Sequence, residues 1–358
     1  MNHPLRRCVA GATAVLIAAS IAPAVAAPRV VKRARVATRY IAMNQQGDGS
    51  ISGGFSRFGT TADGVLAFVA AQRGRRQIRR SIAWLEANLD DATTLGLKAK
   101  AVLAAVAANE DPRSFGGRDL VQEIQDTRTD EGNYGGESDT EVTYHALAML
   151  ALEAAGDDVP AEASQWLRDA QCDDGGWQFD EPAAENDDEH CFDSSAENDF
   201  SRADTNTTAY AVMALDAASG PGPAHDPAAF FASARDEYMR GWVYEPTGKC
   251  TEETLGTEFC YLTDANSTAL VLQAHRDLPR REARSGRAAL MRLQYPRCGK
   301  TMGAFAFTWL YDEMGRFRRD DPNVGATVAA VQGAVRFPLP PEHPVVTKNP
   351  PNRRPCRS

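Results

Sequence analysis

The sequence predicts an all-α protein in which six antiparallel helix pairs close into a double-walled ring. Three observations lead to this prediction: a short polar string recurs four times, each copy opens an alanine-rich apolar stretch, and an amphipathic stretch precedes most of these. A helix that is apolar almost all round must be buried on every side. The alanine-rich stretches are therefore the inner helices of the ring, and the amphipathic stretches are the outer helices.

The recurring string marks the start of the inner helices. Its copies lie 65, 60 and 57 residues apart along the chain. They read Asp139-x-Glu141-x-Thr143-Tyr144, Asp204-x-Asn206-x-Thr208-Ala209, Asp264-x-Asn266-x-Thr268-Ala269 and Asp321-x-Asn323-x-Gly325-Ala326. We expect each opening Asp to cap the helix that follows, because its carboxylate accepts hydrogen bonds from the free amides of the first turn.

Outer and inner stretches alternate along the chain. Outer helices are expected near residues 30–45, 76–89, 117–127, 160–171, 226–239 and 281–294. Inner helices are expected near residues 60–72, 93–108, 138–155, 204–219, 264–278 and 320–336. An open stack of helix pairs would leave two ends that need polar caps, whereas six pairs can close on themselves. We therefore predict one ring domain.

The first 26 residues read as a secretory signal. Two arginines, Arg6 and Arg7, precede an apolar run from Val9 to Ala22, and Ala24-Val25-Ala26 follows as a cleavage site. The paired arginines leave a twin-arginine export signal as an alternative. Both alternatives predict a secreted or cell-envelope protein that is cleaved near Ala26.

Composition restricts the partners of the ring domain, residues 27–337. The chain has 43% hydrophobic residues and a net charge of −9, so we expect a globular protein that repels nucleic acid and anionic membranes. No second apolar run approaches the roughly 20 residues that a transmembrane helix needs. The tail, residues 338–358, is rich in proline and predicts no further domain.

The cysteines predict disulfide bonds. Six remain after the signal segment, an even number that favours disulfides over metal ligands in an exported chain. Local pairing would join Cys172 to Cys191 and Cys250 to Cys260, leaving Cys298 for Cys356. This connectivity is one of about fifteen that six cysteines allow.

A second repeat lies in the turns between outer and inner helices. Its copies are Gly176-Trp177-x-Phe179, Gly241-Trp242-x-Tyr244 and Gly303-x-Phe305-x-Phe307. The first is preceded by Ala163-x-x-Trp166-Leu167-x-x-x-Gln171-x-x-x-Gly175, and a weaker copy runs from Ala37 to Ile51. This string resembles the glutamine–tryptophan repeat of the terpenoid cyclase and protein prenyltransferase superfamily, although Glu162 stands where a basic residue is usual. The resemblance implies an (α/α)6 toroid in which Gln171 and Trp177 brace the outer helices.

The resemblance also implies where a cyclase would carry its acids. Class II terpene cyclases open an inner helix with Asp-x-Asp-Asp-Thr-Ala, and the nearest match here is Asp204-Thr205-Asn206-Thr207-Thr208-Ala209. The second and third acids are an amide and a hydroxyl, so the proton donor is missing. Asp320 and Asp321 form the only acid pair at such a position, and Pro322 at the first helical position explains them as a helix start. Asp204, Asp320 and Asp321 are the catalytic candidates, and we expect a protein without cyclase activity.

No metal or cofactor is expected. A prenyltransferase-type zinc site needs Asp, Cys and His ligands, and the histidines show no ligand spacing. Cys298-Gly299-Lys300-Thr301 lacks the Gln of a complement thioester, and the tail lacks the second domain of a cobalamin carrier. The acidic loop 181–203 has no calcium-loop pattern, so we interpret it as a solvated lid over one mouth of the ring.

The inner-helix N-termini should meet at one mouth, where they bring positive dipole ends and polar side chains. An apolar or isoprenoid-like ligand, or a peptide, would fit such a site. The alternatives are a divergent cyclase or prenyltransferase-type enzyme and a structural surface module whose aromatic side chains only pack the turns. The candidate ligand-binding residues are Tyr144, His145, Trp177, Phe179, Asn206, Tyr210, Trp242, Tyr244, Asn266, Phe305 and Phe307.

Overall fold

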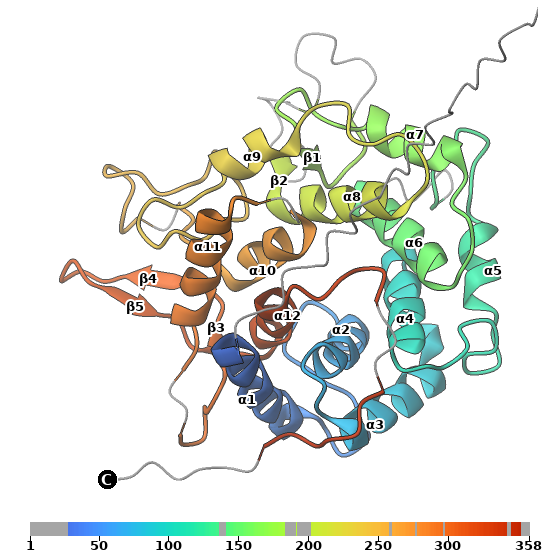
Figure 1. The fold of residues 1–358 in the computed structure, drawn as a ribbon, viewed down its shortest axis with the longest axis horizontal. Coiled ribbons are helices and arrows are strands. Elements are labelled where there is room, and N and C mark those ends of the chain that lie inside the picture. The colour runs from blue at the N-terminus through green and yellow to red at the C-terminus, as the bar shows by residue number, and fades with distance from the viewer. Residues whose placement is uncertain are drawn as a thin grey trace, which may run out of the picture.

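A computed structural model shows two concentric rings of α-helices (Figure 1). It describes residues 28–135, 141–182, 191, 202–257, 260–275, 278–295, 298–341 and 345–351. Twelve α-helices lie in this part of the chain, and they alternate between the outer and the inner ring in sequence order. The predicted all-α toroid is therefore confirmed.

The inner ring is closed. Its helices are α2 (Arg57–Ala70), α4 (Leu95–Ala107), α6 (Val142–Ala154), α8 (Thr205–Ala217), α10 (Ala265–Ala274) and α12 (Val324–Val335). Each inner helix packs against the next, and α12 packs against α2 (Figure 1). Many of the residues at the contacts between inner helices are alanines, whose small side chains let the helices approach closely. Most residues of the inner helices are therefore buried.

The outer helices cover the inner ring. They are α1 (Pro28–Asn44), α3 (Arg75–Ala87), α5 (Leu120–Gln125), α7 (Ala161–Asp169), α9 (Pro227–Ser233) and α11 (Arg280–Arg292), and a short 3-10 turn, Leu89–Asp91, follows α3. Each buries one apolar face against the inner ring and exposes the other, as the amphipathic pattern requires. All twelve segments lie where the sequence predicted them, with bounds that differ by a few residues.

Buried glutamines tie successive outer helices together. Gln171, after α7, donates from Nε2 to the carbonyls of Gly175 at 3.0 Å and His225 at 2.9 Å, just before α9. Gln294, after α11, donates to the carbonyls of Gly303 and Arg33, both at 3.2 Å. Since Arg33 belongs to α1, this contact links the last outer helix to the first. These contacts agree with the bracing that the resemblance implied.

Two of the predicted helix caps are confirmed. Asp204 caps α8 by accepting from the amides of Asn206 and Thr207. Asp264 caps α10 by accepting from the amide of Ser267 at 2.8 Å. Each Asp precedes the first helical residue, as the string predicted.

The prediction that Asp321 caps the last inner helix is wrong. Pro322 and Asn323 form strand β6, which pairs with β3 (Phe305–Ala306), so the chain stays extended and Pro322 does not open the helix. Asn323 is the cap and accepts from the amide of Ala326 at 2.8 Å. The first copy of the string has the same register, because Glu141 directly precedes α6, whereas Asp139 lies outside the described residues.

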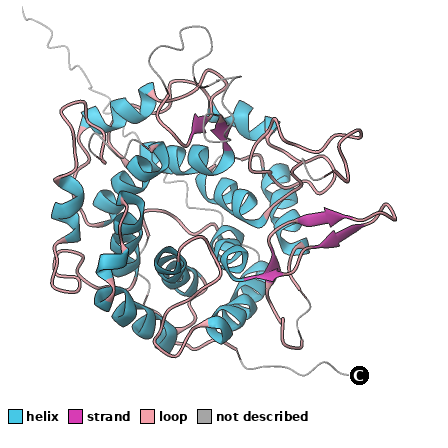
Figure 2. Cartoon of the chain, turned by 180° about the vertical axis from the view of Figure 1, so that it is seen from behind, coloured by secondary structure: helices cyan, strands magenta, loops and turns pink. Residues whose placement is uncertain are grey.

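The strands are short, and one hairpin projects beyond the helical rings (Figure 2). In addition to the pair described above, β1 (Trp177–Gln178) pairs with β2 (Ala203–Asp204), and β4 (Trp309–Tyr311) forms a projecting hairpin with β5 (Phe317–Arg319). The β1–β2 pair fixes the turn aromatic Trp177 against the start of α8.

The two local disulfides are confirmed, Cys172 with Cys191 and Cys250 with Cys260. Cys298 is also disulfide-bonded. Cys356, the signal segment 1–26 and most of the acidic loop 181–203 lie outside the described residues.

The chain that follows α12 crosses the end of the ring where the inner helices finish (Figure 1). Phe337 and Leu339 are buried in the core, and the Lys348 carbonyl accepts from the amides of Gly74 and Arg75 at the start of α3. The described part of the proline-rich tail is therefore packed against the ring. In the part of the chain that the structure describes, no helix is both long and apolar enough to span a membrane.

Candidate functional site

The inner helices begin at the same end of the ring, which we call the N-terminal mouth. Neighbouring first turns are in contact: the Thr143 and Thr207 hydroxyls join α6 to α8 at 2.7 Å, and Ser267 of α10 donates to Asn206 of α8 at 3.1 Å. The Tyr144 ring packs so closely on Gly96 that any side chain there would clash, which joins α6 to α4. The outer helices are antiparallel to the inner ones, so they begin at the opposite end, the C-terminal mouth.

Three polar side chains inside the ring influence one another, although they come from helices that are not all neighbours. Lys100 of α4 forms an ion pair with Asp63 of α2, with Nζ 2.8 Å from Oδ2. The charges of both also influence Tyr210 of α8, which lies across the ring from α2. Only side chains that project toward the ring axis can approach one another in this way. We call Asp63, Lys100 and Tyr210 the central group.

The central group keeps its charge and remains accessible. Burial alone would lower the pKa of Lys100, but the charge and hydrogen bond of Asp63, together with Tyr210 and Tyr144, outweigh it and raise the pKa, so the ammonium persists at neutral pH. Burial also raises the pKa of Tyr210, which keeps the phenol protonated as a donor. The Asp63 and Lys100 side chains remain 27% and 23% exposed.

Helical periodicity explains which residues share this surface. The second and sixth residues of an inner helix lie on one face, as Asn206 and Tyr210 do in α8. In α4 the sixth residue is Lys100, and in α6 and α10 the second residues are Thr143 and Asn266. These side chains are only partly buried, whereas Leu66, Leu147 and Met213 further along the helices are at most 3% exposed.

Three aromatic residues of the turns lie at the rim of the N-terminal mouth. The carbonyls of Phe179, Tyr244 and Phe307 accept from the amides of Val142, Thr205 and Ala265, the first residues of α6, α8 and α10, each at 2.8 Å. The Phe179 ring packs edge-on against Tyr144 at 5.5 Å, and Phe307 is 38% exposed. The structure thus brings Phe179, Tyr144, Tyr244 and Phe307 to the mouth together with the polar side chains.

The structure places the other three turn aromatics elsewhere, between the two rings. Trp177, Trp242 and Phe305 are fully buried, and their amides donate to Thr208, Thr268 and Thr327, the fourth residues of α8, α10 and α12. The indole N–H of Trp177 donates to the Leu167 carbonyl at 2.7 Å, and that of Trp242 to the Phe231 carbonyl at 2.8 Å. These contacts make them part of the scaffold.

His145 occupies the equivalent position in α6 and has the same structural role. Its Nδ1 accepts from the Tyr134 amide at 2.9 Å, so the proton is on Nε2, which donates to the Ala163 carbonyl at 3.0 Å. Burial lowers the pKa of His145 to about 4, so the ring is neutral at physiological pH. The imidazole therefore faces its neighbours and not the ring axis.

Asp204 is enclosed by donors and directed away from the central group. Its carboxylate accepts from two amides and from the Thr207 hydroxyl at 2.6 Å, and the residue is 2% exposed. Burial raises the pKa of Asp204 to about 6, because desolvation of the carboxylate outweighs the hydrogen bonds that favour its ionised form. The second position of α8, on the face of the central group, holds Asn206.

Asp320 and Asp321 lie beside the strands that precede α12. The Asp320 carbonyl accepts from the Tyr295 hydroxyl, and its carboxylate accepts from the amide of Asp321, which is exposed. Among the residues that the structure describes, neither carboxylate forms a hydrogen bond or ion pair with the central group. Within the described ranges, no three His, Cys, Asp or Glu side chains are grouped so that they could hold a metal ion.

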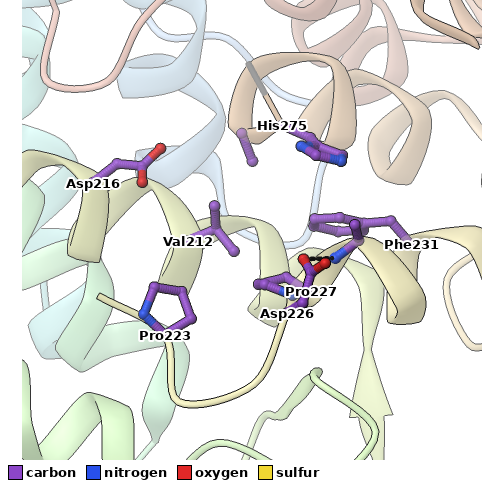
Figure 3. A pocket seen from close by; sticks show the side chains of 9 residues that line it. Val212, Asp216, Pro223, Asp226, Pro227, Phe231 and His275 are labelled. Atoms are coloured by element: carbon purple, nitrogen blue, oxygen red, sulfur yellow. Dashed lines mark hydrogen bonds between the residues drawn. The ribbon is translucent and has the colours of Figure 1, made fainter. Parts of the chain in front are cut away.

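A separate small cavity of about 150 Å³ lies between α8, α9 and α10 (Figure 3). Val212, Pro223 and Pro227 form apolar walls, and His275 stacks on Phe231 with ring centres 5.7 Å apart. Its lining residues come from the C-terminal halves of α8 and α10, from α9 and from the connection between α8 and α9. The cavity is therefore near the C-terminal mouth and separate from the central group.

The sequence reasoning missed Asp63 and Lys100. A usable signal was present, since both are charged residues within stretches that are mostly apolar and rich in Ala, Gly, Leu and Val. A charge in a helix that is buried on all sides requires a partner or a function.

Solved structures share this fold over most of the chain. The unsaturated glucuronyl hydrolase from Streptococcus agalactiae matches with a TM-score of 0.57 at 10% identity, covering 87% of this chain and 93% of that one. The type II terpene cyclase MstE from Scytonema gives a TM-score of 0.54 at 12% identity, covering 86% and 97%. A protein from Actinoplanes gives 0.53 at 16% identity, covering 86% and 98%.

These likenesses define the class of fold. The chain has the (α/α)6 toroid that the terpene cyclase shares with the glucuronyl hydrolase, as the resemblance implied. No protein-family model and no curated protein matches the sequence. Since enzymes of different chemistry share the toroid, its function has to be argued from the site.

Proposed function

We propose that this protein is an exported binding protein without cyclase activity, which takes a small amphipathic molecule at the N-terminal mouth. An isoprenoid-like compound is the first candidate, and an apolar peptide is the second. The observation that carries this proposal is the part-exposed ion pair of Asp63 and Lys100 inside an otherwise apolar ring. Moving an ion pair out of water costs free energy, and apolar side chains could fill the same space without this cost. The two disulfides support export.

The polar side chains favour a ligand with a neutral, hydrogen-bonding head. Lys100 and Tyr210 can donate, and the buried Asn266 Oδ1 accepts no hydrogen bond from the described residues. The charge of Lys100 is balanced by Asp63, and the first-turn amides of α8 and α10 are occupied by their Asp caps. A diphosphate would therefore find no uncompensated cation here. The rim residues Phe179 and Phe307 offer apolar contacts for the rest of the ligand.

Removing the ion pair should weaken binding without unfolding the protein. We expect the double variant Asp63→Leu/Lys100→Met to bind geranylgeraniol at least about tenfold more weakly than the wild type, a loss of about 1.4 kcal/mol. The double change leaves no unpaired buried charge. Isothermal titration calorimetry with geranylgeraniol measures the effect, and geranylgeranyl diphosphate should bind the wild type more weakly than the alcohol.

Lys98→Met is the matched control for this experiment. Lys98 is two residues from Lys100 on the same helix, but it pairs with Glu123 of the outer helix α5 at 3.2 Å. Its removal should leave geranylgeraniol binding unchanged. Equal binding by the wild type and the double variant would refute the role of the ion pair. Native mass spectrometry provides a second measurement. If it detects neither a co-purified nor an added ligand on the protein, the structural module is favoured instead.

The second candidate function is a divergent cyclase, favoured by the raised pKa of Asp204. We expect no cyclisation, because a buried carboxylate that caps a helix cannot reach an alkene, and Asn206 stands at the second position on the face of the central group. Squalene and shorter polyprenes, analysed by gas chromatography, should give no cyclic product above a boiled control. A product that disappears in Asp204→Asn, or in Asp320→Asn with Asp321→Asn, would restore the enzyme hypothesis.

A further inference from the structure

The outer helices α11, α1 and α3 are neighbours on one arc of the ring (Figure 1), and all three begin at the C-terminal mouth. Their first turns expose a set of cations that we call the basic half. No ion pair is formed by any of them within the described ranges, and Glu282 is the only acid in these turns. The members of the basic half are Arg29, Lys32, Arg75, Arg76, Arg79, Arg280, Arg281 and Arg284.

The position of the basic half is the opposite of what the helix dipole favours. The amino end of a helix carries a partial positive charge, so cations in the first turn are unfavourable. Other cations of the same arc also lie near like charges: burial and then Arg284 lower the pKa of Arg287, and burial and then Arg35 lower that of Arg73. A local rule that is broken at three adjacent helices, with no ion pair to these cations from any described residue, points to an anionic partner outside the chain.

The opposite arc of the same mouth is acidic. The last turns of α6 and α8 and the turns that lead into α5, α7 and α9 carry acids that we call the acidic half. One ion pair, Arg113 with Asp157, compensates part of it, and burial and then Asp158 raise the pKa of Glu153. The members of the acidic half are Glu110, Asp111, Glu153, Asp157, Asp158, Asp216 and Asp226. The rim of the C-terminal mouth, around the tail that crosses it, is thus divided into two halves of opposite charge.

We propose that two copies of this chain dock face to face through the C-terminal mouth. A two-fold axis that lies in the face, along the boundary between the halves, sets the basic half of each copy over the acidic half of the other. Such an interface is isologous and satisfies both halves at once. An anionic membrane or nucleic acid would attract the basic half but repel the acidic half, and the chain has a net charge of −9. The second copy therefore fits better.

The experiment reverses charges on each half separately. One variant carries Arg76→Glu and Arg281→Glu in the basic half, and the other carries Glu110→Lys and Asp158→Lys in the acidic half. The control Lys300→Glu/Arg318→Glu changes two exposed cations between α11 and α12, one in a turn and one in strand β5 of the projecting hairpin. Sedimentation equilibrium of the full chain at low and high salt measures association. We expect the wild type and the control to dimerise at low salt, with at least about tenfold weakening when added salt screens the charges.

Mixing the variants gives the decisive result. Each face variant alone should be monomeric, because like charges then oppose each other across the two-fold axis. Their equimolar mixture should form a heterodimer, since the new Glu side chains face the new Lys side chains. Helix dipoles favour Glu in the first turn, so the Arg→Glu variant should not melt below the wild type. A monomeric wild type, a dimeric face variant, or a mixture that stays monomeric would each overturn the proposal. So would a monomeric wild type that sediments with phosphatidylglycerol vesicles.

Discussion

Replacing Trp177 with alanine is expected to lower the free energy of unfolding by about 3–5 kcal/mol, the cost of removing a large aromatic side chain from a packed core. Trp177 is fully buried between the two rings, and its indole N–H donates to Leu167 at 2.7 Å. The substitution leaves a cavity and an unsatisfied carbonyl. Urea denaturation followed by circular dichroism measures the change, and geranylgeraniol affinity of the folded variant should remain close to that of the wild type.

Phe179→Ala is the control, because Phe179 belongs to the same turn but lies at the mouth. It packs against Tyr144 and is only half-buried, so we expect a much smaller loss of stability and a clear loss of ligand affinity. The two variants together distinguish a structural residue, Trp177, from a ligand-binding residue, Phe179, only two positions further along the chain. A stable Trp177→Ala protein that no longer binds ligand would place Trp177 in the site and contradict this division.

The fold was predictable because its physical basis is periodic. Alanine-rich stretches can be buried on all sides only in an inner layer, and the twelve helices follow from that alternation. The sequence could not predict which turn aromatics lie between the two rings and which lie at the mouth. Trp177 and Phe179 belong to the same short motif and differ only in the direction in which their side chains point from the backbone. That difference depends on the pairing of β1 with β2, a contact between segments more than twenty residues apart.

The register of the repeat shows a similar limit. The string has Asp at its first position in all copies, but only Asp204 and Asp264 are caps that the structure describes. In the last copy the cap is Asn323, because pairing with β3 keeps Pro322 and Asn323 extended. Aligned by their caps, the helices place a Thr or His at the fourth position, where it accepts from a turn amide. The hydrogen bond from a turn amide to the fourth residue therefore recurs in all four of these helices, whereas the Asp cap occurs in only two of them.

The buried caps should make stability depend on pH in an unusual direction. Burial raises the pKa of Asp264 to about 6 from 3.8, despite the amide of Ser267 that it accepts. Between these values the folded state binds more protons than the unfolded state, so stability falls as pH rises. The contribution is fully present below about pH 4 and is lost as pH passes through about 6. His145 acts in the opposite sense, because burial lowers its pKa to about 4 and its charging destabilises the fold in acid.

Asp264→Asn isolates this effect, because Asn keeps a cap acceptor but cannot titrate. On going from about pH 7.5 to 4.5, the wild type should gain about 2 kcal/mol of stability relative to the variant. Urea denaturation of both proteins at each pH gives the difference, from which the common contribution of His145 cancels. Asp48→Asn should differ from the wild type in the opposite direction, because hydrogen bonds from Ser50 lower the pKa of exposed Asp48. A pH-independent difference for Asp264→Asn would mean that its carboxylate is not desolvated, and that the N-terminal mouth is open to water down to the caps.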